Sequence, residues 1–385
     1  MERVGLFRCE HYDHTVIREI LENGFPLIGF SPEAFRSARV ALKPNLLSPS
    51  SPERAIITHP EVFRAAAEAV LDHGGTPVLV ESPALASISS TLSTGGYRDI
   101  IFKLGIEVSQ GKKIRKLSYP TGKIFRLFEI SDGLFETDMI LNLPKFKTHG
   151  LTYISAAVKN LFGVVPGLRK SQMHMRFSDR QSFSDFLLDL NGALLNGFES
   201  RKPILHVMDA IVAMEGNGPG SSGTARKLGA LLMGQDAVAL DYIACSLAGL
   251  DIRQVITITS GFQRDFFISG PEEIEVVGER IEDLQVFDFV APSVSLGSRV
   301  LWRSAASRVV RDLFIDRLEP DKDRCILCYR CMQICPAGAI EKAEKNRKVP
   351  TYRTGKCIRC FCCVEVCPED AIRKKRGVFQ KLMGA

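Results

Sequence analysis

The chain has 385 residues, of which 45% are hydrophobic and 24% are charged, and its formal net charge is +6. This composition is ordinary for a globular protein, and the length allows one sizeable α/β domain and a small second domain. No run of 18 clean apolar residues is present, which argues against a membrane-spanning helix.

Short apolar or β-branched runs alternate with helical patterns in the first 292 residues. This alternation predicts βαβ units around a mostly parallel open sheet, that is, a large α/β domain. Seven strands are expected, over Val4–Arg8, Arg39–Lys43, Pro77–Glu81, Met139–Leu143, Ile204–Met208, Ala230–Met233 and Glu273–Val277. Three helices are expected between them, over Pro60–His73, Phe183–Asn196 and Asp236–Ala248, with Asp236 as the N-cap of the last.

Basic and amide side chains follow several of the expected strands in sequence. Ligands of open parallel sheets bind beyond the carboxyl ends of strands, so cations there indicate a site for a carboxylate, phosphate or enolate. The polar loop after Met139–Leu143 supplies Lys145, Lys147 and His149, which we expect to hold the anion. The other candidates are Lys43, Asn45, Lys159, Asn160, Arg169, His174 and Arg176. For any one of them alone, a solvated loop side chain is the default interpretation.

A glycine-rich segment follows the expected strand Ile204–Met208. It contains two carboxylates and three glycines, namely Asp209, Glu215, Gly216, Gly218 and Gly220. Either carboxylate is a candidate acid or base if burial raises its pKa. The glycines permit close backbone approach to a phosphate, but the segment matches neither GxxxxGK[ST] nor a GxGxxG that opens a helix. A conformationally demanding turn therefore has equal weight as an interpretation.

Eight of the eleven cysteines form two copies of one spacing near the carboxyl end. Each copy reads Cys-x2-Cys-x2-Cys-x3-Cys-Pro, and the second lies 32 residues after the first. In bacterial ferredoxins this run holds cubane iron–sulfur clusters, and the fourth cysteine of each run binds the other cluster. We therefore expect two [4Fe-4S] clusters. The expected ligands are Cys325, Cys328, Cys331 and Cys367 for the first cluster, and Cys357, Cys360, Cys363 and Cys335 for the second.

Zinc and disulfide bonds are the other chemistries of clustered cysteines. Zinc prefers paired Cys-x2-Cys knuckles with longer spacers, often with histidine. Disulfides need an oxidising compartment, whereas the first residues lack the apolar segment of a secretory signal and indicate a cytoplasmic protein. Both fit the repeated run poorly. Of the remaining cysteines, Cys9 and Cys245 are expected in the core, and Cys362 is expected to be a spectator beside a ligand.

The positive charge is concentrated at the carboxyl end, where residues 321–385 carry +8 and the remainder −2. An oxidised cubane with four thiolates carries about −2, so the excess is expected to compensate the clusters or attract an acidic redox partner. Nucleic-acid binding is the weaker interpretation. Residues 293–320 are basic and amphipathic, and we expect a helical linker there, or alternatively a helix that docks on a membrane surface or partner.

The segments LPKFKTHG, VKNLFGVVPG, DAIVAMEGNGPG and GQDAVALD resemble those of domain-of-unknown-function family 362. Members of this family often carry the same dicluster ferredoxin at the carboxyl end. The resemblance covers roughly Arg39 to Leu250 and the cysteine runs. It implies an iron–sulfur protein of anaerobic or facultative prokaryotes, and it implies little about mechanism.

The chain is thus expected to divide into an α/β domain (1–292), a basic linker (293–320), a ferredoxin domain (321–375) and a basic tail (376–385). Three functions stay open. The first is an oxidoreductase that delivers electrons to an anionic substrate or cofactor at the strand ends. The second is an electron-transfer or cofactor-maturation partner without turnover of its own, and the third is an iron–sulfur sensor of oxygen.

Overall fold

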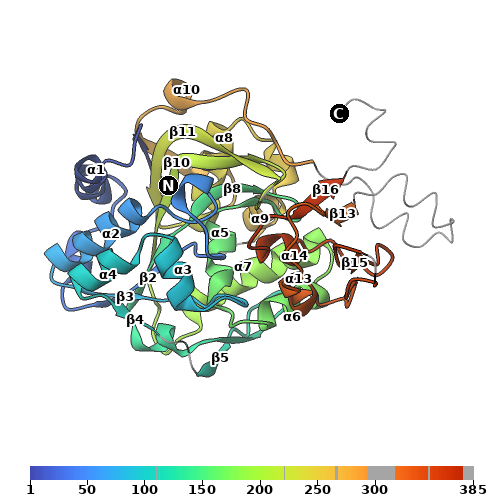
Figure 1. Cartoon of the computed structure of the whole chain (residues 1–385). Coiled ribbons are helices and arrows are strands. Elements are labelled where there is room, and N and C mark those ends of the chain that lie inside the picture. Colours follow the sequence, from blue (N-terminus) through green and yellow to red (C-terminus); the bar gives the residue numbers. More distant parts are fainter. Residues whose placement is uncertain are drawn as a thin grey trace.

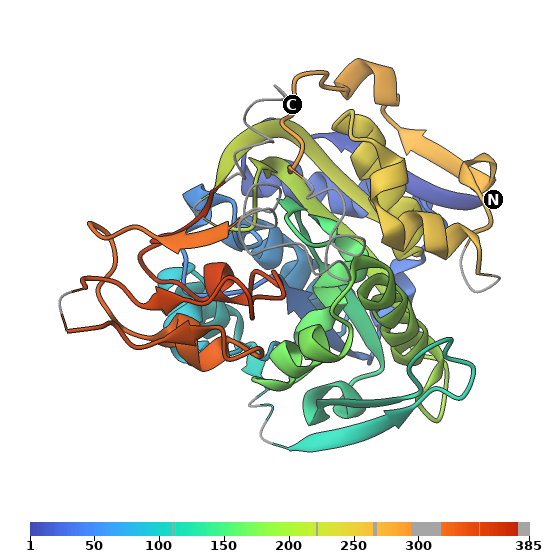
Figure 2. The same cartoon turned by 90° about the vertical axis from the view of Figure 1, so that its right-hand side faces the viewer.

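A large α/β domain is followed by a small domain of short strands and helices (Figure 1). The computed structural model describes residues 1–109, 111, 113–220, 222–264, 268–293, 317–345 and 347–375. Figures 1 and 2 show the small domain, drawn in red and orange, against one side of the large one. The predicted fold class is therefore confirmed. Within the described ranges, none of the helices combines the length and apolar character that crossing a bilayer requires.

The large domain is built on a ten-stranded mixed sheet. Eight of its strands lie side by side in the order β12-β1-β11-β10-β7-β2-β3-β4. These strands are β1 (Glu2–Arg8), β2 (Arg39–Pro44), β3 (Thr76–Leu79), β4 (Glu107–Val108), β7 (Met139–Leu143), β10 (Ile204–Gly216), β11 (Gly223–Gly234) and β12 (Ile274–Gly278). Strands β4, β3, β2, β7 and β10 run parallel, and β11 is antiparallel to both of its neighbours. All seven predicted strands are present. Two of them, β10 and β11, are much longer than predicted and form one hairpin.

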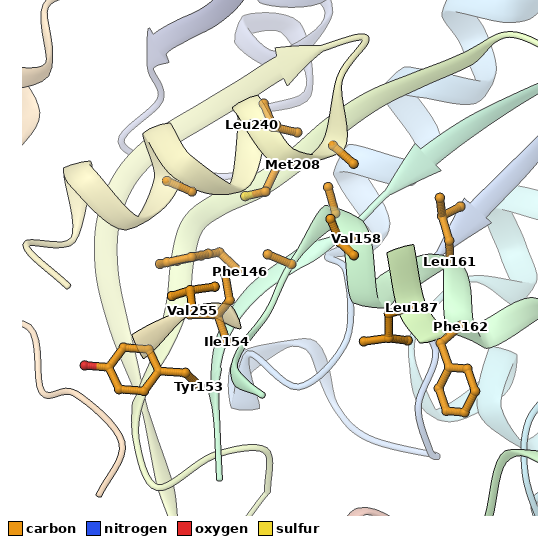
Figure 3. Packing of buried hydrophobic residues seen from close by; sticks show 14 of the residues in the cluster. Phe146, Tyr153, Ile154, Val158, Leu161, Phe162, Leu187, Met208, Leu240 and Val255 are labelled. Carbon is orange, nitrogen blue, oxygen red and sulfur yellow. The ribbon is translucent and has the colours of Figure 1, made fainter. Parts of the chain in front are cut away.

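Helices cover both faces of this sheet, because its buried strands are apolar on both sides. In β2, Val40 and Leu42 belong to the core under α1 (His14–Leu27) and α2 (Pro60–Asp72), whereas Ala41 belongs to the opposite core. Helices α7 (Arg180–Asn196) and α8 (Ala237–Leu247) cover that opposite face. Figure 3 shows part of its packing, in which Phe146, Leu187, Met208 and Leu240 come from four different elements.

The segment that we expected to be a polar loop is instead a buried strand, β8 (Lys145–His149). It pairs with β9 (Tyr153–Ser155) and with the distal half of β10, which continues well past the end of β7. The long β10 provides the free edge on which β8 forms, so the loop prediction was wrong. The consequence is that Lys145, Lys147 and His149 are fixed by backbone pairing rather than held on a mobile loop.

The remaining helices and strands connect or flank these layers. In the large domain they are α3 (Ile88–Thr94), α4 (Arg98–Leu104), β5 (Ile114–Ser118), β6 (Leu127–Ser131), α5 (Ala157–Asn160), α6 (Arg169–Arg176), α9 (Ile256–Phe262) and α10 (Ile281–Leu284). In the small domain they are β13 (Arg317–Pro320), α13 (Arg330–Ile334), β14 (Ile340–Glu341), β15 (Thr351–Tyr352), α14 (Cys362–Glu365) and β16 (Ile372–Lys375).

The small domain begins earlier than predicted. Strand β13 pairs antiparallel with β16, so the last four residues of the expected helical linker are part of this domain. That part of the linker prediction was wrong, because Leu318 and its neighbours find a strand partner in the basic segment after the second cysteine run. The rest of the linker, 294–316, and the tail 376–385 lie outside the described residues.

Asp241 of α8 fixes the start of α5, the short helix that carries Lys159 and Asn160. Its carboxylate is 1% exposed and accepts hydrogen bonds from the amides of Ala157 and Val158, at 2.6 and 3.2 Å. Asp236 caps α8 itself, as predicted, by accepting from Val238 and Ala239. Carboxylates thus satisfy the free amides at the start of two helices.

We predict that Asp241→Ala lowers the free energy of unfolding by about 2–5 kcal/mol, because two buried amides would each lose a partner worth about 1–3 kcal/mol. This change is measured by denaturant titration of the protein after it has been loaded anaerobically with iron and sulfide. Asp99→Ala removes a carboxylate from the exposed surface of α4 and serves as the matched control, with an expected change within about 0.5 kcal/mol. Equal effects of the two substitutions would contradict the role given to Asp241.

Candidate functional site

Two cavities in the small domain are each lined by four cysteines. The first, of about 360 Å³, is lined by Cys325, Cys328, Cys331 and Cys367. The second, of about 340 Å³, is lined by Cys335, Cys357, Cys360 and Cys363. Each set takes three cysteines from one run and the fourth from the other, which is the crossed arrangement expected from the spacing.

The backbone around both cavities repeats with the sequence. Leu327 and Tyr329 of the first run adopt positive φ angles of 54° and 57°, and their counterparts 32 residues later, Arg359 and Phe361, adopt 57° and 64°. These left-handed residues turn the chain so that successive cysteines face one point. Two backbone amides donate to sulfur at 3.2 Å, from Ala339 to Cys335 and from Ala371 to Cys367.

The cavities fit cubane clusters better than single ions. A zinc ion draws four sulfurs to about 2.3 Å from one centre. Among the described residues, no group of three or more histidine, cysteine or acidic side chains is gathered that closely. Thiols spread around a cavity, with amide donors to sulfur and apolar walls such as Ile340 and Ile372, instead suit a cluster that fills the space between them. Such clusters supply one-electron transfer.

A third cavity lies between the two domains and is rich in lysine. The large domain contributes the end of β2, the segments that follow β2 and β3, Lys147 of β8, Ser155 of β9, and residues of α5 and α6. The small domain contributes residues of α13 and α14. Its polar and charged lining comprises Lys43, Asn45, Glu81, Ser82, Lys147, Ser155, Lys159, Asn160, Lys170, Ser171, His174 and Glu365. We call this cavity the lysine pocket.

Lys147 is the most deeply buried cation that has no carboxylate partner in this pocket. Its side chain is 1% exposed, and its amine donates to the Asn45 side-chain oxygen at 2.9 Å and to the Ile56 carbonyl at 2.7 Å. Burial, followed by repulsion from Lys159, lowers the pKa of Lys147 to about 7. Lys43, by contrast, is paired with Glu81 at 2.5 Å.

A network of amide side chains orients the floor of the pocket. Asn45 donates to Asn160 at 2.9 Å, and Asn160 donates to Asn142 at 2.7 Å and to the carbonyl of Lys43 at 3.0 Å. Asn142 in turn bonds to the ring of His206 at 2.9 Å. Because each amide has a fixed partner, the Asn45 oxygen is held in place for the Lys147 amine.

Glu365 of α14 joins the small domain to this site. His149 accepts the Leu151 amide on Nδ1 at 3.0 Å, so its Nε2 carries the proton and donates to Glu365 at 3.1 Å. Lys159 lies 3.6 Å from the same carboxylate. Burial opposes the ionisation of Glu365, but Lys159 and the His149 hydrogen bond outweigh it and hold the pKa of Glu365 well below its usual range.

Several expected site residues lie elsewhere. Lys145 forms a buried pair with Asp209 at 2.9 Å, and both contact the Tyr12 hydroxyl, so this cluster ties the N-terminal segment to the sheet. Arg169 pairs with Glu129, and Glu215 accepts the backbone amide of Val290 at 3.0 Å. None of Lys145, Asp209, Glu215, Arg169 and Arg176 lines the lysine pocket.

The three glycines of the hairpin turn are explained by close packing. Gly216 and Gly220 have positive φ angles of 77° and 116°, and a Cβ on Gly218 would lie 2.5 Å from the carbonyl oxygen of Thr148. A Cβ on Gly220 would lie 3.2 Å from Val364 of α14. The turn therefore supports the contact between the domains, and only Pro219 of this segment lines the lysine pocket.

Sequence reasoning missed Glu81, Lys170 and Glu365. Glu81 lies two residues after the end of β3, so the strand-end rule that selected Lys43 also applied to it. Glu365 lies between two predicted cluster ligands in sequence, where a charged side chain is ordinarily interpreted as solvent-exposed. Lys170 is the second residue of α6, and nothing in the local sequence distinguishes it from a solvated lysine.

We predict that Cys363→Ala removes one cluster and Cys362→Ala removes none. Cys363 lines the second cysteine cavity, whereas its neighbour Cys362 lines the lysine pocket. Iron and acid-labile sulfide, measured after anaerobic reconstitution, should fall by about half in Cys363→Ala and stay at the parent value in Cys362→Ala. The reverse pattern would show that the ligand of the second cluster has been misassigned.

Known proteins share both parts of this architecture. The 4Fe-4S dicluster domain matches residues 317–368, so the chain is an iron–sulfur protein. The thylakoid-associated protein sll1697 of Synechocystis sp. is 32% identical over 310 residues, which cover 76% of this chain and 92% of that protein.

Two solved structures share only a distant likeness with the chain. The lactate racemase apoprotein of Thermoanaerobacterium thermosaccharolyticum has a TM-score of 0.39 at 13% identity, over 62% of this chain and 55% of its own. A Thermotoga maritima protein has a TM-score of 0.36 at 11% identity, over 60% of this chain and 57% of its own. The chain thus spans little more than half of either structure. The family model described as a domain of unknown function, DUF362, matches residues 40–246, and the chain belongs to this family.

Proposed function

We propose that the protein holds two [4Fe-4S] clusters and delivers their electrons to an anionic substrate or cofactor bound in the lysine pocket. One observation carries this proposal. Helix α14 supplies a wall of the lysine pocket through Cys362 and Glu365, and Cys363 of the same helix lines the second cysteine cavity. An anion in the pocket would therefore be bound next to a helix that also carries a cluster ligand.

The charges of the pocket suit a reduction. A molecule that accepts an electron gains negative charge, and fixed cations in a site that excludes water stabilise that charge strongly. Lys147 is held by Asn45 and Ile56 before any ligand arrives, so little reorganisation is needed. His149 is neutral, since burial and Lys159 lower its pKa to about 4. It therefore positions Glu365 rather than adding charge.

The two cysteine cavities differ in their exposure to solvent. This difference supports a path in which electrons enter at the first cluster and leave through the second. At the first cavity, Cys328 is exposed and Ile326 is 61% exposed. The second cavity is lined by Cys363 of α14, the helix that also lines the lysine pocket. A redox partner protein is thus expected to dock at the first cluster, and the bound anion to receive electrons through the second.

We predict that Lys147→Met slows electron delivery by about 10²-fold, the usual loss when one preorganised charge donor is removed. The protein is reduced anaerobically and mixed with a panel of carboxylates and phosphate esters, and cluster re-oxidation is followed by absorbance. Methionine keeps the length of the buried stem, and Lys103→Met on the exposed face of α4 is the matched charge control.

Iron and sulfide content must match between the variants for this comparison to count. If no small anion re-oxidises the parent protein and only a partner protein does, the chain is an electron-transfer partner without turnover of its own. If Lys147→Met is re-oxidised as fast as the parent protein, the lysine pocket is not the place of delivery.

We also predict that anion affinity falls as the pH rises through about 7 and 8. These are the values to which burial lowers the pKa of Lys147 and of Lys170, from an ordinary value of 10.5. An anion binds the protonated amines, so affinity is full below these values and is lost above them. Sulfate, whose charge is constant in this range, is the probe, and calorimetry gives its affinity. Affinity that persists unchanged to about pH 10, the ordinary lysine range, would contradict this prediction.

A further inference from the structure

The balance of charge in the lysine pocket defines its ligand more closely than the word anion does. Four lysines and two glutamates line it. Lys43 is neutralised by Glu81 at 2.5 Å, and Lys159 by Glu365 at 3.6 Å. The other two cations, Lys147 and Lys170, have no carboxylate within ion-pair distance among the described residues. The pocket therefore carries an excess of two positive charges when both are protonated.

Both of the uncompensated lysines are held by neutral oxygen atoms. The amine of Lys147 donates to a side-chain amide and a backbone carbonyl, as described above, and the amine of Lys170 donates to the carbonyl of Ser82. Such acceptors fix the position of an ammonium group but do not neutralise it. A buried charge without a counter-ion is costly, and a ligand of opposite charge removes that cost.

A second feature of the pocket points to a ligand independently of charge. His174 of α6 lines the pocket, is 3% exposed, and its Nδ1 has no hydrogen-bond partner among the described residues. Its ring is held by stacking on Phe183, with the ring centroids 4.2 Å apart. Burial keeps this imidazole neutral by lowering its pKa to about 3. Buried polar atoms normally have partners, so a ligand atom is expected to complete this one.

We infer that the lysine pocket takes a small organic molecule with two negative charges, of the dicarboxylate or phosphate-monoester type. Lys147 and Lys170 neutralise the two charges, and His174 bonds to a further polar group. This inference rests on the proposed function, whose anion it specifies.

Two pairs of probes, similar in shape and different in charge, test the inference on the cluster-loaded protein. Sulfate is compared with methanesulfonate for the tetrahedral type, and succinate with succinamate for the dicarboxylate type. Calorimetry at about pH 6.5 keeps Lys147 largely protonated. At least one dianion is expected to bind about tenfold more tightly than its matched monoanion, a difference of about 1.4 kcal/mol. The pair that shows the preference identifies the type.

The variants Lys147→Met and Lys170→Met should each bring the ratio of the two affinities close to one, whereas Lys103→Met should leave it unchanged. If a variant does not fold, the ratio in the parent protein still decides the matter. Equal affinity for dianion and monoanion would overturn the inference and leave the proposed function standing. Failure of all four probes to bind would overturn both.

Discussion

The contact between Glu365 of the small domain and the pair His149 and Lys159 of the large domain holds the candidate site together. It is largely shielded from solvent and links residues more than two hundred positions apart. The ion pair of Lys159 and Glu365 contributes little net stability if desolvation is counted, yet removing either of these two side chains leaves an unpaired charge. The arrangement therefore fixes one orientation of α14 on β8. Without that orientation, the lysine pocket would lack one of its walls.

Close packing enforces the same orientation. A Cβ on Gly150, directly after β8, would lie 2.7 Å from the ring of Phe361, which is itself buried in the loop of the second cysteine run. Arg54 pairs with Asp370 at the other end of the contact. The loop that wraps the cysteines is thus seated directly on the strand that carries Lys147, so cluster binding and pocket shape depend on the same few contacts.

The parts of this architecture differ in how far the sequence predicts them. The cysteine cavities follow from spacing within short runs, because the fourth cysteine of each run lies only four residues after the third and directly before a proline. Strand β8 was missed because alternating Lys145, Lys147 and His149 read as solvated, and only the long β10 gives them a buried edge. Glu365 and Lys170 were missed because domain docking, which no local pattern encodes, brings them to the pocket.

The burial of Lys147 without a carboxylate partner lowers the stability of the fold, and this cost argues for a role in binding. A core that needed only to be stable would place an apolar side chain at this point of β8, where Phe146 and Ile154 already pack on neighbouring positions. The amide network of Asn45, Asn160 and Asn142 serves to hold this one amine and its surroundings. Proteins typically lose stability in this way at sites that bind a charged ligand.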